Sequence, residues 1–164
     1  MKLSSHEEYG LRCLLRLGFA GEGGSLTIPE ISQAEGVSNA YVAKLLRILR
    51  RGGFVKSARG KAGGYTLARP ADRVVVGEVI DELGGRFFDP GFCNQHAGQM
   101  TVCANTVDCS VRSLWRALQV VVDDVLQKTT LHDLMRNEHD MSSWVTTLPG
   151  SRLAALRDNP LPSQ

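Results

Sequence analysis

The sequence of 164 residues has few of the features that mark membrane, secreted or disordered proteins. No apolar stretch approaches the roughly 18 to 20 residues that span a bilayer, and the opening residues lack the basic-then-apolar layout of a secretion signal. Charged residues are 22% of the chain and nearly balance, at 19 basic and 17 acidic, which excludes a disordered polyelectrolyte. We therefore expect a soluble, cytoplasmic protein with no membrane partner and enough residues for a single hydrophobic core.

Cysteine is also scarce, with four residues in the whole chain. Thiols stay reduced in the cytoplasm, where cysteines bind metals or lie buried more often than they form disulfides. Cys13 falls in the middle of a predicted helix and is interpreted as a small core residue. The other three, Cys93, Cys103 and Cys109, lie together in a stretch without clear periodicity.

Positive charge is concentrated in one part of the chain. Residues 42–73 contain nine basic residues and a single acid, Asp72, which gives this stretch a net charge of +8. Such a concentration is typical of a surface that binds a polyanion, although a solvated helix face followed by a basic loop has the same composition.

The spacing of apolar residues predicts a helix-turn-helix within this first part of the chain. A first helix covers residues 7–20, and a capping box of Thr27 with Glu30 starts a second helix that ends near Gly36. A third helix begins at Ser38 or Asn39, and its predicted buried side consists of Val42, Leu45, Leu46 and Leu49.

A β-hairpin follows this unit. Residues 54–58 and 65–68 have the pattern of strands, and the glycine-rich stretch between them predicts a turn. The fold class is therefore mainly α with a small β-hairpin wing: a winged helix-turn-helix plus a long dimerisation helix.

The remaining chain divides into three further parts. After a short predicted helix at 74–83, the winged helix-turn-helix domain ends at residue 85, and its first helix is expected to pack in the dimer as well. Residues 86–109, called the cysteine segment below, are expected to be irregular, which is unusual for two dozen residues unless something holds them. Residues 110–147 form the dimerisation helix and a C-terminal helix, and residues 148–164 a loose tail. The apolar stripe along 110–127 needs a partner, which predicts a two-fold homodimer.

A helix-turn-helix places the start of its second helix against base edges in the major groove. The candidate DNA-contacting residues follow from this geometry, with the Asn39 amide suited to adenine and the wing tip suited to the narrow minor groove. They are Ser38, Asn39, Tyr41, Lys44, Arg47, Arg59, Gly60 and Lys61.

Three features of the sequence are distinctive when taken together: the stretch SNAYVAKLLRILRRGGFVKSARGKAGGYTLARP, the opening MKLSSHEEYGLRCLLRL and the cysteines before a long helix. In these features the chain resembles the IscR/NsrR (Rrf) family of winged-helix transcription regulators over residues 1–130. The resemblance implies a homodimer that binds a partly palindromic double-stranded DNA operator, more commonly as a repressor. It also implies an iron-sulfur cluster that senses redox state, nitric oxide or iron-sulfur status. The first cysteine spacing is longer than is common in the family, and Arg112 stands where one branch has a histidine ligand.

A set of four protein ligands is expected for a cluster with tetrahedral iron, and three thiolates leave one ligand to be identified. Soft thiolates select iron-sulfur clusters, zinc or copper(I), so Cys93, Cys103 and Cys109 are the predicted metal ligands. The resemblance implies Glu8 of the partner subunit as the fourth ligand, and the alternative is His96, three residues after Cys93. A 2Fe-2S cluster is favoured and a 4Fe-4S cluster stays open. Structural zinc on the three cysteines and His96, or direct thiol sensing without a cluster, are the alternatives.

Catalysis is not expected. An enzyme would need Cys109 as a nucleophile with one of three histidines as base, and nothing in the spacing favours such a pair. No phosphate-binding loop or paired-carboxylate motif occurs either.

Overall fold

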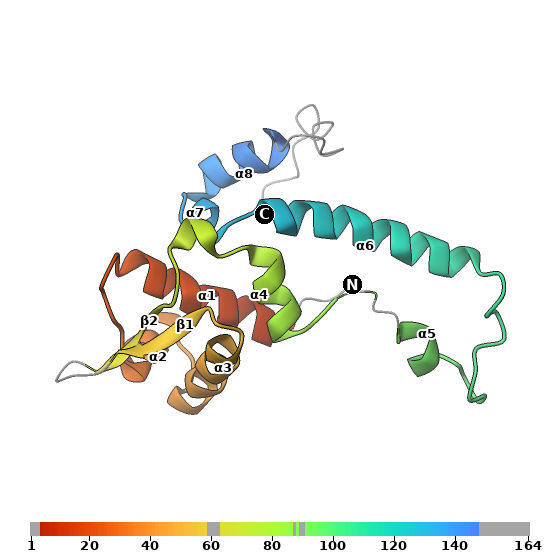
Figure 1. The fold of residues 1–164 in the computed structure, drawn as a ribbon, viewed down its shortest axis with the longest axis horizontal. Helices are drawn as coiled ribbons and strands as arrows, with labels where there is room; N and C mark the ends of the chain where they lie inside the picture. Colours follow the sequence, from red (N-terminus) through yellow and green to blue (C-terminus); the bar gives the residue numbers. More distant parts are fainter. Residues whose placement is uncertain (1–3, 59–62, 87, 89–90, 148–164) are drawn as a thin grey trace.

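The computed structural model describes residues 4–58, 63–86, 88 and 91–147. A lobe of short helices and one β-hairpin carries a long helix that projects away from it (Figure 1). The mainly helical fold with a hairpin wing is confirmed.

Helix α1 (Ser5–Phe19) forms the centre of the lobe. The Glu7 carboxylate accepts a hydrogen bond from the Ser4 backbone N–H at 2.5 Å, which satisfies a donor that the first helical turn leaves free. Cys13, Leu14 and Leu17 are buried at the spacing of a single helix face, and they pack against the third helix and the hairpin. α1 therefore anchors the elements that carry the basic residues.

The helix-turn-helix consists of α2 (Ile28–Glu35) and α3 (Asn39–Arg51). Thr27 and Glu30 form the predicted capping box at the start of α2. Gly36 ends α2 with a φ of 66°, in the left-handed region that glycine adopts without strain. Ser38 then caps α3 by accepting the N–H of Tyr41. Because these caps and the glycine stop are local in the sequence, the predicted bounds of the two helices agree closely with the structure.

The wing is the antiparallel pair β1 (Val55–Ala58) and β2 (Gly64–Leu67), in which Val55 pairs with Leu67 and Ala58 with Gly64. Leu26 adds an isolated antiparallel bridge to Tyr65, so the hairpin is attached to the chain just before α2. Both strands lie within one residue of their predicted bounds.

The predicted helix at 74–83 begins later than expected. A single 3-10 turn, η1 (Ala71–Arg73), comes first, and α4 covers Val76–Leu83. Val74 and Val75 are extended because they pair with the chain before α7 (Leu131–Leu134): the Leu131 N–H donates to the Val74 carbonyl at 2.8 Å. This pairing joins the C-terminal part to the lobe.

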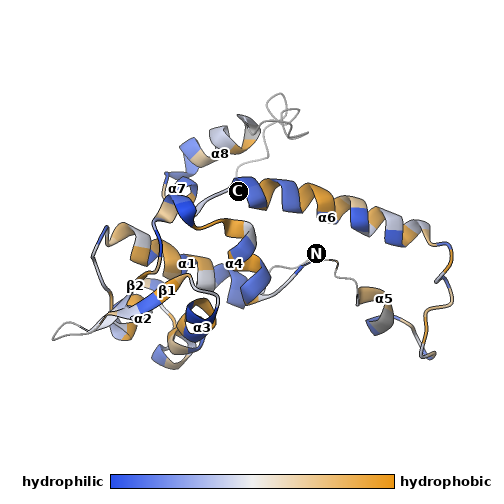
Figure 2. Ribbon diagram, in the orientation of Figure 1, coloured by the Kyte–Doolittle hydropathy of each residue, from blue (hydrophilic) through white to orange (hydrophobic). Residues whose placement is uncertain are grey.

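α6 (Ser110–Lys128) is the long predicted helix and packs on α4 near Lys128, at its C-terminal end. A Cβ at Gly77 of α4 would lie 2.6 Å from the Gln127 side chain, so the two helices approach closely there. Figure 2 shows apolar residues along α6 where it projects from the lobe. α8 (Glu138–Thr147) is the expected C-terminal helix, and the predicted tail lies outside the described residues.

The cysteine segment is not wholly irregular. A short helix, α5 (Phe92–Gln95), lies within it, contrary to the prediction. The Phe92 ring stacks on His96 at 4.0 Å between centroids and contacts Phe88 at 5.1 Å. This aromatic stack stabilises one helical turn that has no periodic pattern in the sequence.

Among the described ranges, no helix combines the length and apolar character needed to cross a membrane.

Candidate DNA-binding surface and cysteine segment

α3 has one buried side and one side open to solvent. Val42, Leu45, Leu46 and Leu49 are fully buried, as the spacing predicts. Ser38, Asn39, Lys44 and Arg47 are all exposed on the remaining surface. The predicted DNA-contacting residues of this helix other than Tyr41 are therefore accessible at its start and middle.

Tyr41 differs from the other candidates. Its ring stacks on His6 of α1 at 5.7 Å between centroids and meets the edge of Tyr9 at 6.0 Å. Its hydroxyl is buried and has no hydrogen-bond partner among the described residues. In this arrangement Tyr41 fixes the first turn of α3 on α1 and is not extended toward a groove.

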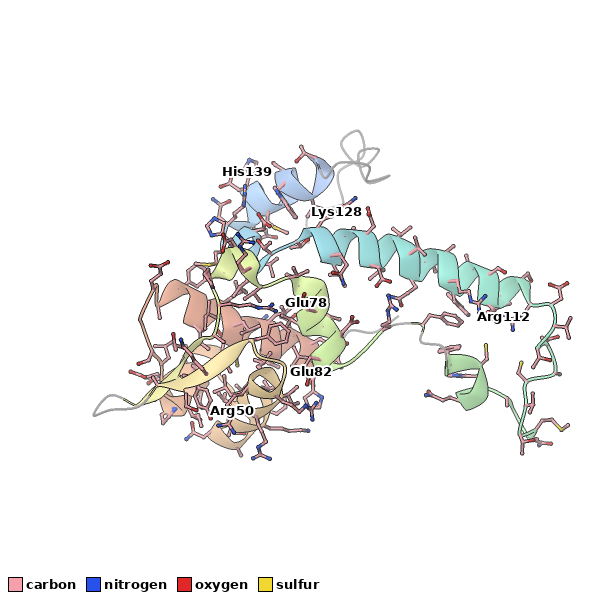
Figure 3. All side chains as sticks on the ribbon, in the orientation of Figure 1. Arg50, Glu78, Glu82, Arg112, Lys128 and His139 are labelled. Atoms are coloured by element: carbon pink, nitrogen blue, oxygen red, sulfur yellow. The ribbon has the colours of Figure 1, made fainter. Side chains whose placement is uncertain are left out.

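Part of the basic charge is neutralised by ion pairs between residues of the lobe. Arg51 pairs with Glu82 at 2.8 Å, and Arg69 pairs with Glu78, so two acids of α4 reduce the charge of the 42–73 stretch. Arg50, on the outer surface of α3 in Figure 3, donates to the Ser57 hydroxyl of the wing. Lys44 and Arg47 make no ion pair within the described part of the chain, which leaves them available to a polyanion. The predicted wing-tip residues Arg59, Gly60 and Lys61 lie outside it.

The three cysteines of the cysteine segment are all free and partly accessible. Cys93 lies in α5, Cys103 in the coil that follows, and Cys109 at the N-cap of α6, where its sulfur accepts the Arg112 N–H at 3.4 Å. The Arg112 guanidinium donates to the Thr106 carbonyl at 3.0 Å and ties the end of this segment to α6. Figure 3 shows Arg112 at the end of α6 away from the lobe, whereas Arg50 lies on the lobe.

His96 has the geometry of an available metal ligand. Its Nδ1 lies 2.8 Å from the Phe92 carbonyl oxygen, which can only accept, so Nδ1 carries the proton. A neutral imidazole then presents its lone pair at Nε2, and metal-bound histidines commonly donate their other nitrogen to a carbonyl in this way.

Glu7 and Glu8 have different surroundings. Glu7 is 8% exposed, caps α1 and packs against Gly84, where a Cβ would lie 2.3 Å from its Oε1. Glu8 is half exposed and pairs with Arg12 at 2.6 Å. Of the two neighbours, only Glu8 has a carboxylate that can leave its partner at small cost, since exposed pairs contribute little.

Arg12 links Glu8 to the helix-turn-helix. Its second ion-pair partner is Glu35, at 3.9 Å, and Arg16 pairs with the same carboxylate at 2.5 Å. The Glu35 side chain is 5% exposed and ends α2, one residue before the turn into α3.

Cys13 is confirmed as a core residue, since it is fully buried in α1. Burial, with the negative charge of Glu35 adding to it, raises the pKa of the Cys13 thiol to about 12. It is therefore neutral and unreactive at physiological pH.

The described residues of one chain do not bring the predicted metal ligands together. Among the described residues, no three His, Cys, Asp or Glu side chains come together in a way that could hold a metal ion. The donor set still fits an iron-sulfur cluster in its chemistry, because the segment presents three partly accessible thiols, and within the described residues only Cys109 has a hydrogen-bond partner for its sulfur.

α6 presents a broad apolar surface to solvent. Six of its large apolar side chains are between 40% and 67% exposed, and Gln119 is its one buried residue. They are Val111, Leu114, Trp115, Leu118, Val120 and Val121. A surface of this size is unusual on a lone subunit.

The chain has clear relatives among known proteins. The family model named Rrf2, described as an iron-dependent transcriptional regulator, matches residues 3–137. The chain is 34% identical over 137 residues to protein rrf2 of Nitratidesulfovibrio vulgaris, covering 84% of this chain and 89% of that protein. It is 32% identical over 138 residues to the HTH-type transcriptional regulator IscR of Escherichia coli, covering 84% of this chain and 82% of IscR.

Solved structures give the same result. CymR of Bacillus subtilis, described as a global cysteine regulator, superposes with a TM-score of 0.66 and 30% identity over 82% of this chain and 96% of CymR. The oxidised form of Staphylococcus aureus CymR superposes with a TM-score of 0.66 and 28% identity over 84% of this chain and 98% of that chain. The relatives are regulators and not enzymes, in agreement with the sequence analysis. This chain therefore belongs to the Rrf2 family of transcriptional regulators.

Proposed function

We propose that this regulator binds a partly palindromic DNA operator as a homodimer, and that the state of Cys93, Cys103 and Cys109 controls its affinity. The observation that carries the proposal is the layout of the chain: accessible thiols lie at one end of an apolar helix, and a basic recognition helix lies in the lobe at the other end. An allosteric regulator has a sensing site and a DNA-binding site that are distinct, and this layout provides both.

DNA binding is supported by α3. Asn39 can hydrogen-bond to adenine, and Lys44 and Arg47 can contact guanine or phosphate. All three side chains are exposed, and none forms an ion pair within the described part of the lobe. Arg59 and Lys61 remain the predicted minor-groove contacts.

A dimer is supported by α6. Its apolar side chains would be covered by the same surface of a second copy, as a two-fold interface requires. Two recognition helices related by that axis would meet two half-sites, which is why the operator is expected to be palindromic in part. Sedimentation of the purified protein tests this step: a dimer is expected at micromolar concentration, and a monomer would contradict it.

An iron-sulfur cluster, 2Fe-2S by preference, is the cofactor that the donor set supports best. Cys93, Cys103 and Cys109 would hold it, with Glu8 of the partner subunit as the fourth ligand. When bound, the cluster supplies an iron centre that responds to oxidants and nitric oxide. The similarity to IscR and the description of the Rrf2 family as iron-dependent both support this choice.

The residues of α1 provide a route from the cysteine segment to the DNA. If Glu8 is drawn away from Arg12, the Arg12 guanidinium is free to move closer to Glu35, which it already approaches at 3.9 Å. Glu35 ends α2 directly before the turn that positions α3, so the change reaches the recognition helix through two ion pairs. In the same turn of α1, His6 and Tyr9 contact Tyr41 of α3.

The cofactor is tested by purification without oxygen. The expected result is a coloured protein that absorbs beyond about 400 nm and contains iron and sulfide in matching amounts. A colourless protein that remains poor in iron after reconstitution would contradict the cluster.

Two rivals are supported by particular observations. Structural zinc is supported by the Nδ1 hydrogen bond of His96, which prepares Nε2 to join the cysteines. Direct thiol oxidation is supported by the similarity to CymR, a protein with a solved oxidised form. A colourless protein with stoichiometric zinc would favour the first rival, and a metal-free protein whose thiols oxidise reversibly would favour the second.

A further inference from the structure

The solvent-facing side of α3 contains two alanines among much longer side chains. Ala40 is exposed, one turn before Lys44, and Ala43 is partly buried, one turn after Asn39 and one turn before Arg47. Because residues four apart are neighbours on a helix surface, the sequence Asn39, Ala43, Arg47 forms one row, and Ala40 with Lys44 forms the row beside it. From Lys44 to the end of α3, all the exposed residues are Lys or Arg.

These two methyl groups occupy the N-terminal half of α3, the part of a recognition helix that approaches the floor of the major groove most closely. Neither methyl group can donate or accept a hydrogen bond. Tyr41, whose hydroxyl could do so, is held against α1 by His6 and Tyr9. The first two turns therefore present Ser38, Asn39 and Lys44 with a small apolar patch between them.

We infer that Ala40 and Ala43 read the methyl groups of thymine, so that each operator half-site contains thymine beside the bases that Asn39 and Lys44 contact. Thymine is the one base that presents a methyl group in the major groove, and alanine is among the side chains that contact it. Apolar contact at this place selects thymine over cytosine without any hydrogen bond, and the short side chain lets α3 lie deep enough for Asn39 to reach an adenine edge. This inference rests on the proposed binding of operator DNA by α3.

The test begins with selection of binding duplexes from a random pool by the full-length protein. Each thymine of the enriched half-site is then replaced by deoxyuridine, which removes the methyl group and leaves the pairing unchanged. Loss of one buried methyl contact is expected to weaken binding about four-fold. The thymine that shows this effect identifies the contacted position.

The Ala40→Gly and Ala43→Gly variants complete a double-mutant cycle, in which the protein loses a methyl group at one position and the DNA loses one at another. Each is measured on the thymine and deoxyuridine duplexes, and the ratio of the two affinities is compared with that of the unaltered protein. Any effect of glycine on helix stability cancels in this ratio, because the same protein is used on both duplexes. We expect the ratio to fall to about one for at least one of the two variants at a given thymine. Ala34→Gly makes the same change at an exposed position of α2 and should keep the four-fold ratio.

The possible failures are distinguishable. If no duplex is enriched and no DNA binding is measured, the proposed function fails. If a motif is enriched but no deoxyuridine substitution weakens binding, or if both glycine variants keep the full ratio, the inference about Ala40 and Ala43 is overturned while DNA binding stands.

Discussion

Glu7 and Glu8 are adjacent carboxylates for which the structure predicts opposite consequences on substitution. Glu7 accepts the Ser4 N–H at 2.5 Å and is almost fully buried against Gly84, whereas Glu8 is half exposed and its carboxylate pairs with Arg12. We therefore expect Glu7→Ala to affect folding and Glu8→Ala to affect the cofactor.

The magnitudes follow from these contacts. Removal of a partly buried, charge-assisted cap costs about 1 to 2 kcal/mol, which lowers the melting temperature of a chain of this size by about 2 to 8 °C. The Glu8 to Arg12 pair is an exposed i,i+4 pair worth only about 0.3 to 0.5 kcal/mol, so Glu8→Ala should change the melting temperature by less than about 2 °C.

Two measurements on each variant separate the effects. Thermal unfolding of the metal-free protein reports stability, and visible circular dichroism of protein prepared without oxygen reports the ligands of the chromophore. Glu8→Ala should alter the visible spectrum at an unchanged melting temperature, and Glu7→Ala should do the reverse. A changed spectrum for Glu7→Ala together with an unaltered spectrum for Glu8→Ala would exclude Glu8 as the ligand.

Three further predictions concern accessibility, packing and assembly. Because burial raises the pKa of Cys13 to about 12, a maleimide at pH 7 should label the three thiols of the cysteine segment in native metal-free protein and reach Cys13 only after unfolding. Gly10→Ala should destabilise the protein by about 1 to 3 kcal/mol in chemical denaturation, because the added Cβ would lie 2.4 Å from Leu83 Cδ1. Gly18→Ala, in the same helix, should stabilise it by about 0.5 to 1 kcal/mol, since the new methyl meets the flexible end of Met135 at 3.1 Å and lies at an ordinary contact distance of 3.8 Å from Leu131 Cδ2. Leu118→Glu, on the exposed face of α6, should shift sedimentation from dimer toward monomer, because a charge cannot be buried at a two-fold interface without a partner.

Each of these has a contradicting result. Native labelling of Cys13 as fast as that of the cysteine segment would show that α1 opens readily. Equal stability changes for the two glycine variants would show that α1 and α4 are not packed as described. A Leu118→Glu protein that remains dimeric would place the interface elsewhere.

The elements that could be predicted from sequence are those with local signals. The caps at Thr27 and Ser38, the stop at Gly36 and the apolar spacing of α3 lie within a few residues of the structure they determine. α5 could not be predicted, because its single turn is stabilised by the ring stack of Phe92 on His96 and not by periodicity. The later start of α4 could not be predicted either, since Val74 pairs with Leu131, far along the chain.

The candidate site was predictable in its chemistry and less so in its geometry. Three thiols in one segment and a basic helix are visible in the sequence, but the packing of Tyr41 on His6 depends on how α1 crosses α3. Glu7 and Glu8 cannot be distinguished by residue type, and only their different burial assigns the cap to the first. No three possible metal ligands come together within the described part of one chain, so the sequence predicts the residue types of the ligand set but not their arrangement.

The proposed dependence of operator affinity on the cysteine segment is tested most directly by one binding measurement. The selected duplex is titrated with protein prepared without oxygen, with the same protein after removal of the cofactor, and with Cys103→Ala. We expect dissociation constants that differ by roughly 5- to 150-fold between the first two forms, with Cys103→Ala matching the form without cofactor. Equal dissociation constants for all three forms would show that the cysteine segment does not control operator binding.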